Sequence, residues 1–288
     1  MIRAGGSRDN LCAAGEPRRG VRQMMNNLLD HLPDGFHRLR LDDGRRAIAK
    51  LRRRAPAGFF AAEARGLEAL AGTKTLRVPD VFAIGERGIL IEDLGAGRAG
   101  RADWERAGTD LARLHGHASD TFGFDSDGWC GDSPQDNTRC ADGHVFFAEH
   151  RLRPQTLRAR ASGELDAGDV ARIERMCAQL PHLVPAMPPV LIHGDLWTAN
   201  LHACASGELA LIDAGAVHYG WAEADLAMLT LFGEPPASFF AAYEAASGVD
   251  PAWRGRAPLY NLYHLLNHLN LFGASYLGGV HAVLRRYG

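Results

Sequence analysis

Apolar residues along the first third of the chain form short, strand-like runs interrupted by one helical stretch. The runs predict a hairpin over residues 39–51, closed by the Asp42-Asp43-Gly44 turn, and two further strands over 81–84 and 89–91. Residues 59–70 combine helical spacing with high helix propensity. The pattern therefore predicts a small sheet with one helix packed against it.

Helical spacing dominates the rest of the chain, and no internal repeat interrupts it. We expect the chain to cross from a nucleotide-binding lobe, residues 1–95, to a helical lobe, residues 96–288, at the Gly95-Ala96-Gly97 segment. The first 20 residues have few large apolar side chains, so we expect a loose start followed by a short helix over 21–32. The helices predicted in the second lobe span residues 103–117, 145–161, 164–180, 221–232, 236–246 and 257–272.

Composition sets limits on the function. The chain has 288 residues, enough for a large core and two lobes, with 23% charged residues and a net charge of −2. This charge creates no strong field for nucleic acid or an anionic membrane, and we find neither a run of 18 apolar residues nor a leader-like start. We therefore expect a cytoplasmic protein without nucleic-acid or membrane partners, and we favour a monomer. Five scattered cysteines without a C-x-x-C pair fit a reducing compartment: Cys12, Cys130, Cys140, Cys177 and Cys204.

One segment carries most of the chemical information. His193-Gly194-Asp195 is followed by Asn200, five residues after the aspartate, and by Asp213, thirteen residues after Asn200. Apolar runs over 189–192 and 208–212 predict two strands, and we expect these to pair through the turn that precedes the second run. The H-x-D-x-x-x-x-N spacing directly after a strand is that of a phosphoryl-transfer catalytic loop.

The residue types in this segment suit that chemistry. Phosphoryl transfer from a nucleotide depends mainly on alignment and on neutralising developing charge, so its site needs a divalent metal more than a covalent nucleophile. Asp195 can accept the proton of an attacking hydroxyl, while Asn200 and Asp213 offer hard oxygen ligands to Mg²⁺. The alternative is a polar turn whose side chains cap backbone groups. The catalytic interpretation is favoured because a second, carboxylate-bearing strand follows the motif.

A family resemblance rests on four parts of the chain: residues 193–200 (HGDLWTAN), Asp213, residues 219–228 (YGWAEADLAM) and residues 259–273 (LYNLYHLLNHLNLFG). Residues 134–137 (PQDN) and 146–155 (FFAEHRLRPQ) extend it upstream. Together they resemble the fructosamine kinase (ketosamine-3-kinase) family, within the aminoglycoside phosphotransferase and choline kinase group. The HGD-x-x-x-x-N spacing marks only that wider group, and the segments after it narrow the resemblance to fructosamine kinases.

The resemblance implies an α+β, protein-kinase-like fold with a small antiparallel-sheet N-lobe and a larger, mostly helical C-lobe. It also implies ATP and Mg²⁺ as cofactors, and a small-molecule or protein-bound ketoamine as acceptor, phosphorylated at the sugar 3-hydroxyl in protein deglycation. Other acceptors stay open, namely an aminoglycoside, an amino alcohol or another sugar. A non-catalytic, kinase-like binding module is a weaker alternative, because Lys50, Asp195, Asn200 and Asp213 are all present.

In a kinase-like N-lobe, a strand lysine holds the nucleotide phosphates, and a glutamate on the next helix positions that lysine. Lys50 and Glu63 occupy these places, with Glu68 as the competing glutamate. The hinge segment Glu92-Asp93-Leu94 ends the last strand before the crossing, where backbone groups can contact the edge of the adenine ring.

Two departures from the family pattern concern nucleotide and acceptor binding. Paired glycines commonly precede the lysine strand, whereas this region has only Asp34-Gly35, and Gly5-Gly6 comes far too early. A lone glycine leaves fewer backbone amides for phosphate. After the metal carboxylate, residues 214–219 (AGAVHY) form a segment one residue longer than usual that includes a histidine. We expect metal binding to survive this change and acceptor contacts to differ.

The resemblance also makes five residues candidates for acceptor contacts: His193, Trp197, Tyr219, His264 and His268. On the last predicted helix, His264 and His268 lie away from the leucine stripe, where they can bind a polyhydroxylated acceptor or be satisfied within a buried face. Their spacing also suits zinc, but Leu265 stands where a zinc hydrolase has glutamate, and no third ligand is apparent. Glu223 and Asp225 are expected to brace the loop around the site.

Overall fold

The computed structural model of the chain describes residue 25 and residues 27–288. Residues 27–31 are helical, which agrees with the later part of the helix predicted over 21–32. The expected loose start over residues 1–20, with its Gly5-Gly6 pair, lies outside the described residues.

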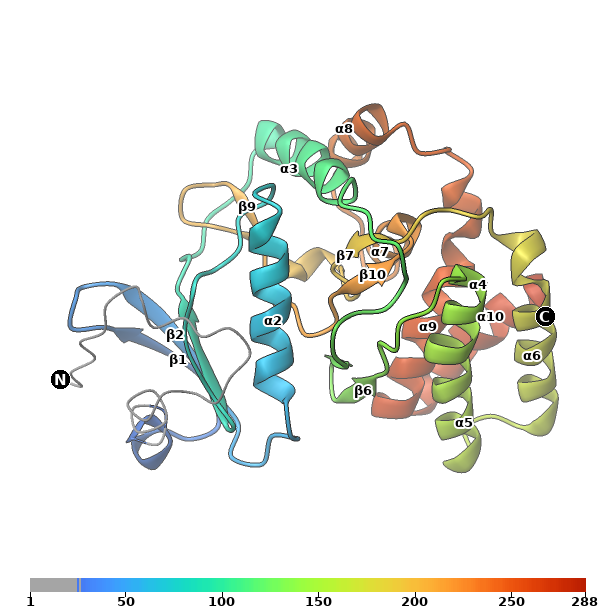
Figure 1. The fold of residues 1–288 in the computed structure, drawn as a ribbon, viewed down its shortest axis with the longest axis horizontal. Helices are drawn as coiled ribbons and strands as arrows, with labels where there is room; N and C mark the ends of the chain where they lie inside the picture. Colours follow the sequence, from blue (N-terminus) through green and yellow to red (C-terminus); the bar gives the residue numbers. More distant parts are fainter. Residues whose placement is uncertain (1–24, 26) are drawn as a thin grey trace.

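A four-stranded antiparallel sheet forms the smaller part of the molecule (Figure 1). Its strands lie in the order β1-β2-β4-β3, and helix α2 (Phe59–Gly72) covers one face. The predicted hairpin, helix and two later strands are confirmed; β1 begins four residues before its predicted run and ends one residue short of it, and the other elements extend one or two residues beyond theirs. The strands are β1 (Gly35–Arg40), β2 (Arg46–Leu51), β3 (Val81–Gly85) and β4 (Gly88–Glu92).

Strand alternation determines the direction of the Lys50 side chain. Ala47, Ala49 and Leu51 pack into a small core on one face of the sheet, together with Met25. Because successive side chains on a strand point to opposite faces, Lys50 faces the other side, where α2 lies. The sequence pattern of β2 thereby directs a cation toward that helix.

Helix α2 also packs against the larger lobe, and Gly66 permits the close approach. A Cβ atom built at Gly66 would lie 1.8 Å from the carbonyl oxygen of Ala214, the residue that follows Asp213. A side chain at this position is therefore excluded, and the contact fixes the distance between α2 and the segment that carries Asp213.

The larger part of the molecule is mostly helical (Figure 1). A five-residue π-helical turn, Ala148–Leu152, joins α4 to α5, so the helix predicted over 145–161 is nearly continuous. The helix predicted over 221–232 ends earlier than expected, and α10 was not predicted. The helices are α3 (Arg101–Leu114), α4 (Gly143–Phe147), α5 (Arg153–Ala161), α6 (Ala167–Leu183), α7 (Ala222–Met228), α8 (Ala237–Ser247), α9 (Trp253–Phe272) and α10 (Leu277–Tyr287).

The larger lobe contains three short two-stranded pairs, and one expected pairing is wrong. Strand β7 (Val190–Ile192) pairs with β10 (His218–Gly220), while β9 (Leu209–Leu211) pairs with β8 (Leu201–Ala203). The two apolar runs on either side of the motif therefore do not pair with each other. Residues 201–203 compete successfully because they reach β9 through a tight turn, which closes a shorter loop. The third pair joins β5 (Gly128–Cys130) to β6 (Ser133–Gln135), which the sequence did not indicate.

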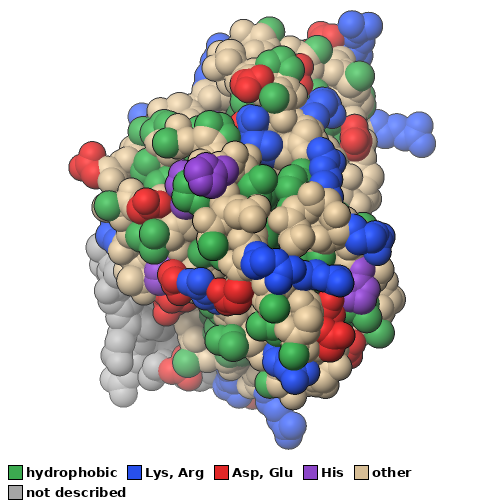
Figure 2. Space-filling view, turned by 90° about the vertical axis from the view of Figure 1, so that its right-hand side faces the viewer, with side chains coloured by type: hydrophobic (Ala, Val, Ile, Leu, Met, Phe, Trp, Pro, Cys, Tyr) green, Lys and Arg blue, Asp and Glu red, His purple; other side chains and the backbone are tan. Residues whose placement is uncertain are grey.

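Acidic and basic side chains are intermixed over the face of the larger lobe shown in Figure 2. This distribution agrees with the small net charge of −2. Among the described residues, none of the helices has both the length and the apolar character that a membrane crossing requires.

Candidate active site

The loop that follows β7 is held by one buried carboxylate. Asp225 on α7 accepts hydrogen bonds from the backbone N–H groups of His193, at 2.7 Å, and Gly194, at 2.9 Å. Gly194 has a φ of 79°, and a Cβ there would lie 2.2 Å from the Ala216 carbonyl oxygen. The expected bracing by Asp225 thus takes the form of two backbone hydrogen bonds directly before Asp195.

Two further hydrogen bonds place Asp195, Asn200 and Asp213 in one neighbourhood. The Asn200 side-chain amide donates to the Asp195 carbonyl oxygen at 2.8 Å, across the single 3₁₀ turn Thr198–Asn200. The fully buried His193 ring contacts the carbonyl oxygen of Ile212 through Nε2 at 2.9 Å. The loop is thereby tied to the residue that precedes Asp213, and the His193 side chain is occupied within the core.

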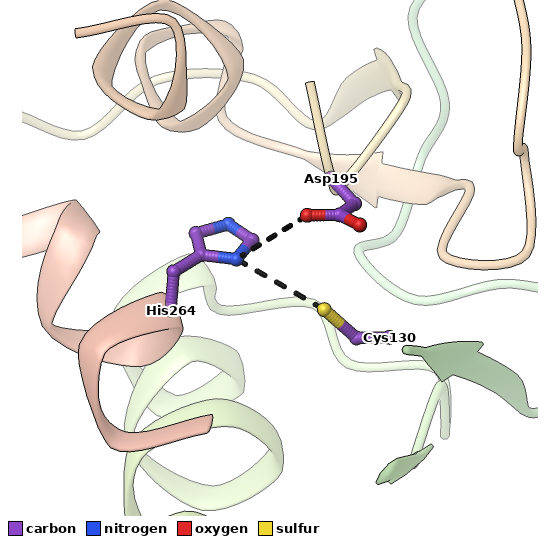
Figure 3. A group of neighbouring side chains, drawn as sticks. All are labelled: Cys130, Asp195 and His264. Atoms are coloured by element: carbon purple, nitrogen blue, oxygen red, sulfur yellow. Dashed lines mark hydrogen bonds and ion pairs between the residues drawn. The ribbon is translucent and has the colours of Figure 1, made fainter. Parts of the chain in front are cut away.

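Asp195 lies in a shielded environment with His264 and Cys130 (Figure 3). The His264 Nδ1 is 3.7 Å from an Asp195 carboxylate oxygen and 3.9 Å from the Cys130 sulfur. Burial, aided by the charges of Asp213 and Asp225, raises the pKa of Asp195 to about 7. Burial also lowers the pKa of His264 to about 3, so near neutral pH an uncharged imidazole faces the aspartate.

The three side chains in Figure 3 have ligand atoms close enough for a metal ion. Their protonation argues for a hydrogen-bonding group instead, because burial raises the pKa of the Cys130 thiol well above its usual value. The zinc alternative considered for the sequence paired His264 with His268. His268 does not belong to this group of ligand atoms, and its Nδ1 is already engaged by the backbone carbonyl of His264 at 2.8 Å.

Lys50 of the sheet lobe reaches the segment that carries Asp213. Its ammonium group forms ion pairs with Glu63 on α2 and with Asp213, the latter at 2.9 Å. Burial works to lower the pKa of Lys50, but the two carboxylates outweigh it and the pKa lies above its usual value. A permanently charged lysine therefore joins the sheet lobe to the segment that carries Asp213.

Asp213 combines a left-handed backbone with an exposed side chain. It has a φ of 64°, and 60% of its side chain is exposed. Desolvation opposes its ionisation, but Lys50 outweighs this effect and holds the pKa of Asp213 below its usual value. Because the Asn200 nitrogen is engaged by Asp195, the Asn200 amide oxygen is left for a ligand. A carboxylate and an amide oxygen form a hard donor set that fits Mg²⁺.

The hinge residues hold the crossing between the lobes. The Glu92 carboxylate pairs with Arg77, and the Asp93 N–H donates to the Arg46 carbonyl oxygen at 3.1 Å. The Leu94 carbonyl oxygen accepts from the Ala205 N–H at 3.0 Å, in the turn between β8 and β9. The hinge backbone is therefore tied to β2 and to the turn between β8 and β9, and the Leu94 carbonyl is already paired.

The remaining acceptor candidates fall into two places. Trp197, two residues after Asp195, is 38% exposed, and His268 lies one helical turn beyond His264 on α9. Tyr219 on β10 pairs its backbone with Gly123, and its ring packs near Phe124. The structure therefore brings His264 to Asp195 and leaves Trp197 partly exposed two residues after it, and it places Tyr219 against the segment around Gly123.

A buried polar network behind the loop was missed by sequence reasoning. The Gln135 side-chain amide donates to the Ala216 carbonyl oxygen at 2.9 Å and accepts from the Tyr263 hydroxyl at 3.0 Å. Arg151 donates to Asn137 at 2.7 Å and is almost fully buried. These residues lie in segments that carry the family resemblance, and that resemblance was the one signal by which the sequence could have pointed to them. Their spacing along the chain indicates no role. They fix the segment after Asp213 from behind.

A cavity of about 30 Å³ lies behind the loop, lined by Gly194, Asp225 and His264 among others. This is room for about two water molecules and too little for a sugar. The Nε atom of Arg151 and the Nε1 atom of Trp221, two further lining residues, have no hydrogen-bond partner among the described residues. The cavity therefore suits water and not a sugar.

Comparison with known proteins places this geometry in a family. The family model for fructosamine kinase matches residues 36–287. A probable ketoamine kinase of Synechocystis is 38% identical over 241 residues, covering 82% of this chain and 81% of that protein. The chloroplastic protein-ribulosamine 3-kinase of Arabidopsis thaliana is 35% identical over 245 residues, covering 80% of this chain and 72% of that protein.

Solved structures agree. A candidate fructosamine-3-kinase from Thermobifida fusca superimposes with a TM-score of 0.81 and 37% identity, covering 87% of this chain and 88% of that one. An ADP-bound aminoglycoside phosphotransferase gives a TM-score of 0.58 at 13% identity, covering 93% of this chain and 97% of that one. The second similarity concerns the fold alone and confirms the two-lobed, protein-kinase-like architecture.

Proposed function

The chain belongs to the fructosamine kinase family, and on this premise we propose that it transfers the γ-phosphoryl group of ATP to the 3-hydroxyl of a ketoamine. The observation that carries the proposal is the contact between the ammonium group of Lys50 and the carboxylate of Asp213. The Nζ atom of Lys50 lies 2.9 Å from the Oδ1 atom of Asp213, beside the Asp195 loop. A phosphate-binding cation, a metal carboxylate and a general base then line one cleft between the lobes. The acceptor is a small-molecule or protein-bound ketoamine, such as fructosyl-lysine.

Asp195 is the general base of this proposal. Its pKa of about 7 makes the carboxylate more basic than an ordinary aspartate, while a substantial fraction of it stays ionised near neutral pH and can take a proton from a hydroxyl group. In the transfer, the sugar oxygen forms a bond to the γ-phosphorus, the bond to the leaving ADP oxygen breaks, and the hydroxyl proton passes to Asp195. The bonds from Asp225 to the two preceding backbone N–H groups hold the base in place.

The other cleft residues align the donor. Lys50, positioned by Glu63, contacts the phosphates of ATP, and the backbone of Glu92-Asp93-Leu94 lies along the adenine. Asn200 and Asp213 hold Mg²⁺, which when bound neutralises charge on the phosphate oxygens. On the acceptor side, Trp197, His264 and His268 line the approach to Asp195. We assign His193 to positioning, because its ring is buried against the Ile212 carbonyl.

The product suggests a role in deglycation. A phosphate on the hydroxyl next to the ketone carbon is a good leaving group, so the phosphorylated adduct is less stable than the ketoamine. Phosphorylation at that position therefore prepares the release of the free amine from the sugar.

The test measures ADP formation by the full chain with MgATP and a panel of acceptors: ketoamines, free sugars, amino alcohols and aminoglycosides. We expect ketoamines to give the highest kcat/KM, and Asp195→Asn to lower kcat by about 10²- to 10⁴-fold. The matched control is Asp110→Asn, which removes a partly buried carboxylate that pairs with Arg113 on α3, away from the catalytic loop. Higher kcat/KM with another acceptor class, or unchanged turnover by the Asp195 variant, contradicts the proposal.

A further inference from the structure

Four rings gather where α9 ends, and we call them the ring cluster: Phe232, His268, Phe272 and Tyr276. The His268 ring lies at their centre, with its centroid 4.8 Å from Phe232, 5.4 Å from Phe272 and 5.0 Å from Tyr276. Phe232 and Phe272 each also contact Tyr276, at 6.4 and 6.1 Å. Distances of this size are those of interacting aromatic pairs, so the rings form one surface.

Two contacts connect the ring cluster to the catalytic loop. On α9, His268 lies one turn after His264, whose Nδ1 is 3.7 Å from Asp195. On the loop side, the Thr198 hydroxyl donates to the carbonyl oxygen of Gly233, the neighbour of Phe232. The cluster therefore lies about one helical turn from the general base.

The ring cluster is open to a ligand. Phe272 is 64% exposed and Phe232 is 39% exposed. Among the described residues, six large apolar side chains are exposed, and three of them, Trp197, Phe232 and Phe272, belong to the catalytic loop or the cluster. Exposed apolar surface concentrated beside a catalytic base is typical of a binding site rather than of a random surface.

His268 adds a hydrogen-bond acceptor to these faces. Because its Nδ1 contacts the His264 carbonyl oxygen at 2.8 Å, Nδ1 carries the proton and Nε2 presents a lone pair. Burial lowers the pKa of His268, which keeps the ring neutral near neutral pH. Aromatic faces together with a neutral acceptor nitrogen attract an alkylammonium group.

We propose that the ring cluster is a subsite for the amine and the amine-linked side chain of the ketoamine acceptor. This inference rests on the proposed function, because a ketoamine carries a secondary ammonium group two carbons from the hydroxyl that faces Asp195. With that hydroxyl at the base, the ammonium group and its alkyl substituent reach the cluster one turn away. The subsite then selects ketoamines over the same sugar without its amine.

The experiment compares a fructosyl-lysine peptide with 1-deoxyfructose, which keeps the sugar and lacks the amine. For Phe272→Leu and for Phe232→Leu, which each remove one exposed ring of the cluster, we expect the KM for the peptide to rise about tenfold. The KM for ATP, the kcat and the kcat/KM for 1-deoxyfructose are expected to stay within twofold. Leu157→Ala, at an apolar position on α5 that is 66% exposed, serves as the control and is expected to change none of these values.

The outcomes separate the subsite from the function. If the wild-type enzyme phosphorylates the peptide and the variants leave its KM unchanged, the subsite is wrong while the kinase activity stands. If the variants raise the KM for the peptide and the KM for 1-deoxyfructose equally, the cluster binds the sugar ring and not the amine. That result also overturns the subsite. If the wild-type enzyme phosphorylates no ketoamine, the proposed function fails and the subsite with it.

Discussion

At the scale of single residues, Asp195 illustrates how burial creates a base. Folding raises its pKa from 3.8 to about 7, so between these values the folded chain holds a proton that the unfolded chain releases. The stability from this group is therefore complete below about pH 4 and is lost as the pH rises to about 7, by up to about 1.4 kcal/mol per pH unit. Asp195→Asn lacks this loss.

We therefore expect the melting temperature of Asp195→Asn to exceed that of the wild type increasingly from pH 4 to pH 7, and then by a constant amount. Differential scanning fluorimetry without Mg²⁺ or nucleotide measures the difference. Asp110→Asn should show no such trend. A difference that is the same at pH 5 and pH 8 contradicts the raised pKa of Asp195.

Asp225 is a second single residue with a large expected effect, because its carboxylate holds the loop that carries Asp195. In Asp225→Ala, the N–H groups of His193 and Gly194 lose their acceptor in a buried place, which costs about 1–3 kcal/mol each. We expect a lower melting temperature by several degrees and a large loss of kcat. Asp225→Asn keeps one acceptor oxygen, so its melting temperature should lie between those of Asp225→Ala and the wild type. Equal stability of Asp225→Ala and the wild type is incompatible with this bracing.

At the scale of elements, α2 positions Glu63 through its contact with the larger lobe. Gly66→Ala places a methyl group against the Ala214 carbonyl oxygen, so α2 must move away and carry Glu63 with it. We expect a lower melting temperature and a higher KM for ATP. Gly72→Ala, in the same helix, meets nothing within 4 Å and should be neutral or stabilising by up to about 1 kcal/mol. Comparable effects of the two substitutions would count against the close approach.

The elements also show how much of the fold can be predicted from local sequence patterns. The hairpin over β1 and β2 and helix α2 follow from spacing, because each buries one face against a neighbour, and helix α9 follows from its long, mostly apolar run, which is buried nearly all round. The pairing of β7 with β10 does not follow, since these strands are three residues long and the competing partners differ only in loop closure. The hairpin of β5 and β6, which delivers Cys130 to Asp195, likewise has no distinctive pattern.

At the scale of the whole molecule, Lys50 and Asp213 join the two lobes through one ion pair. Asp213→Asn should leave Lys50 paired with Glu63 and remove the metal carboxylate. We expect ATP to raise the melting temperature of the wild type much more with Mg²⁺ than with EDTA, and this dependence on Mg²⁺ to disappear in the variant. Asp110→Asn should keep it. If ATP stabilises Asp213→Asn as much more with Mg²⁺ than with EDTA as it does the wild type, Asp213 is not a ligand of the metal.

The sequence by itself determined the chemistry of the loop and the elements that bury one face, because these depend on residue types and spacings along a short stretch of chain. Asp195, Asn200 and Asp213 are recognisable for that reason, and so is the cation on β2. Only the tertiary structure decided what surrounds them: the imidazole of His264, the Gly66 contact with Ala214 and the ring cluster. These join residues far apart in the chain, and which of many possible neighbours meet depends on packing of the whole molecule.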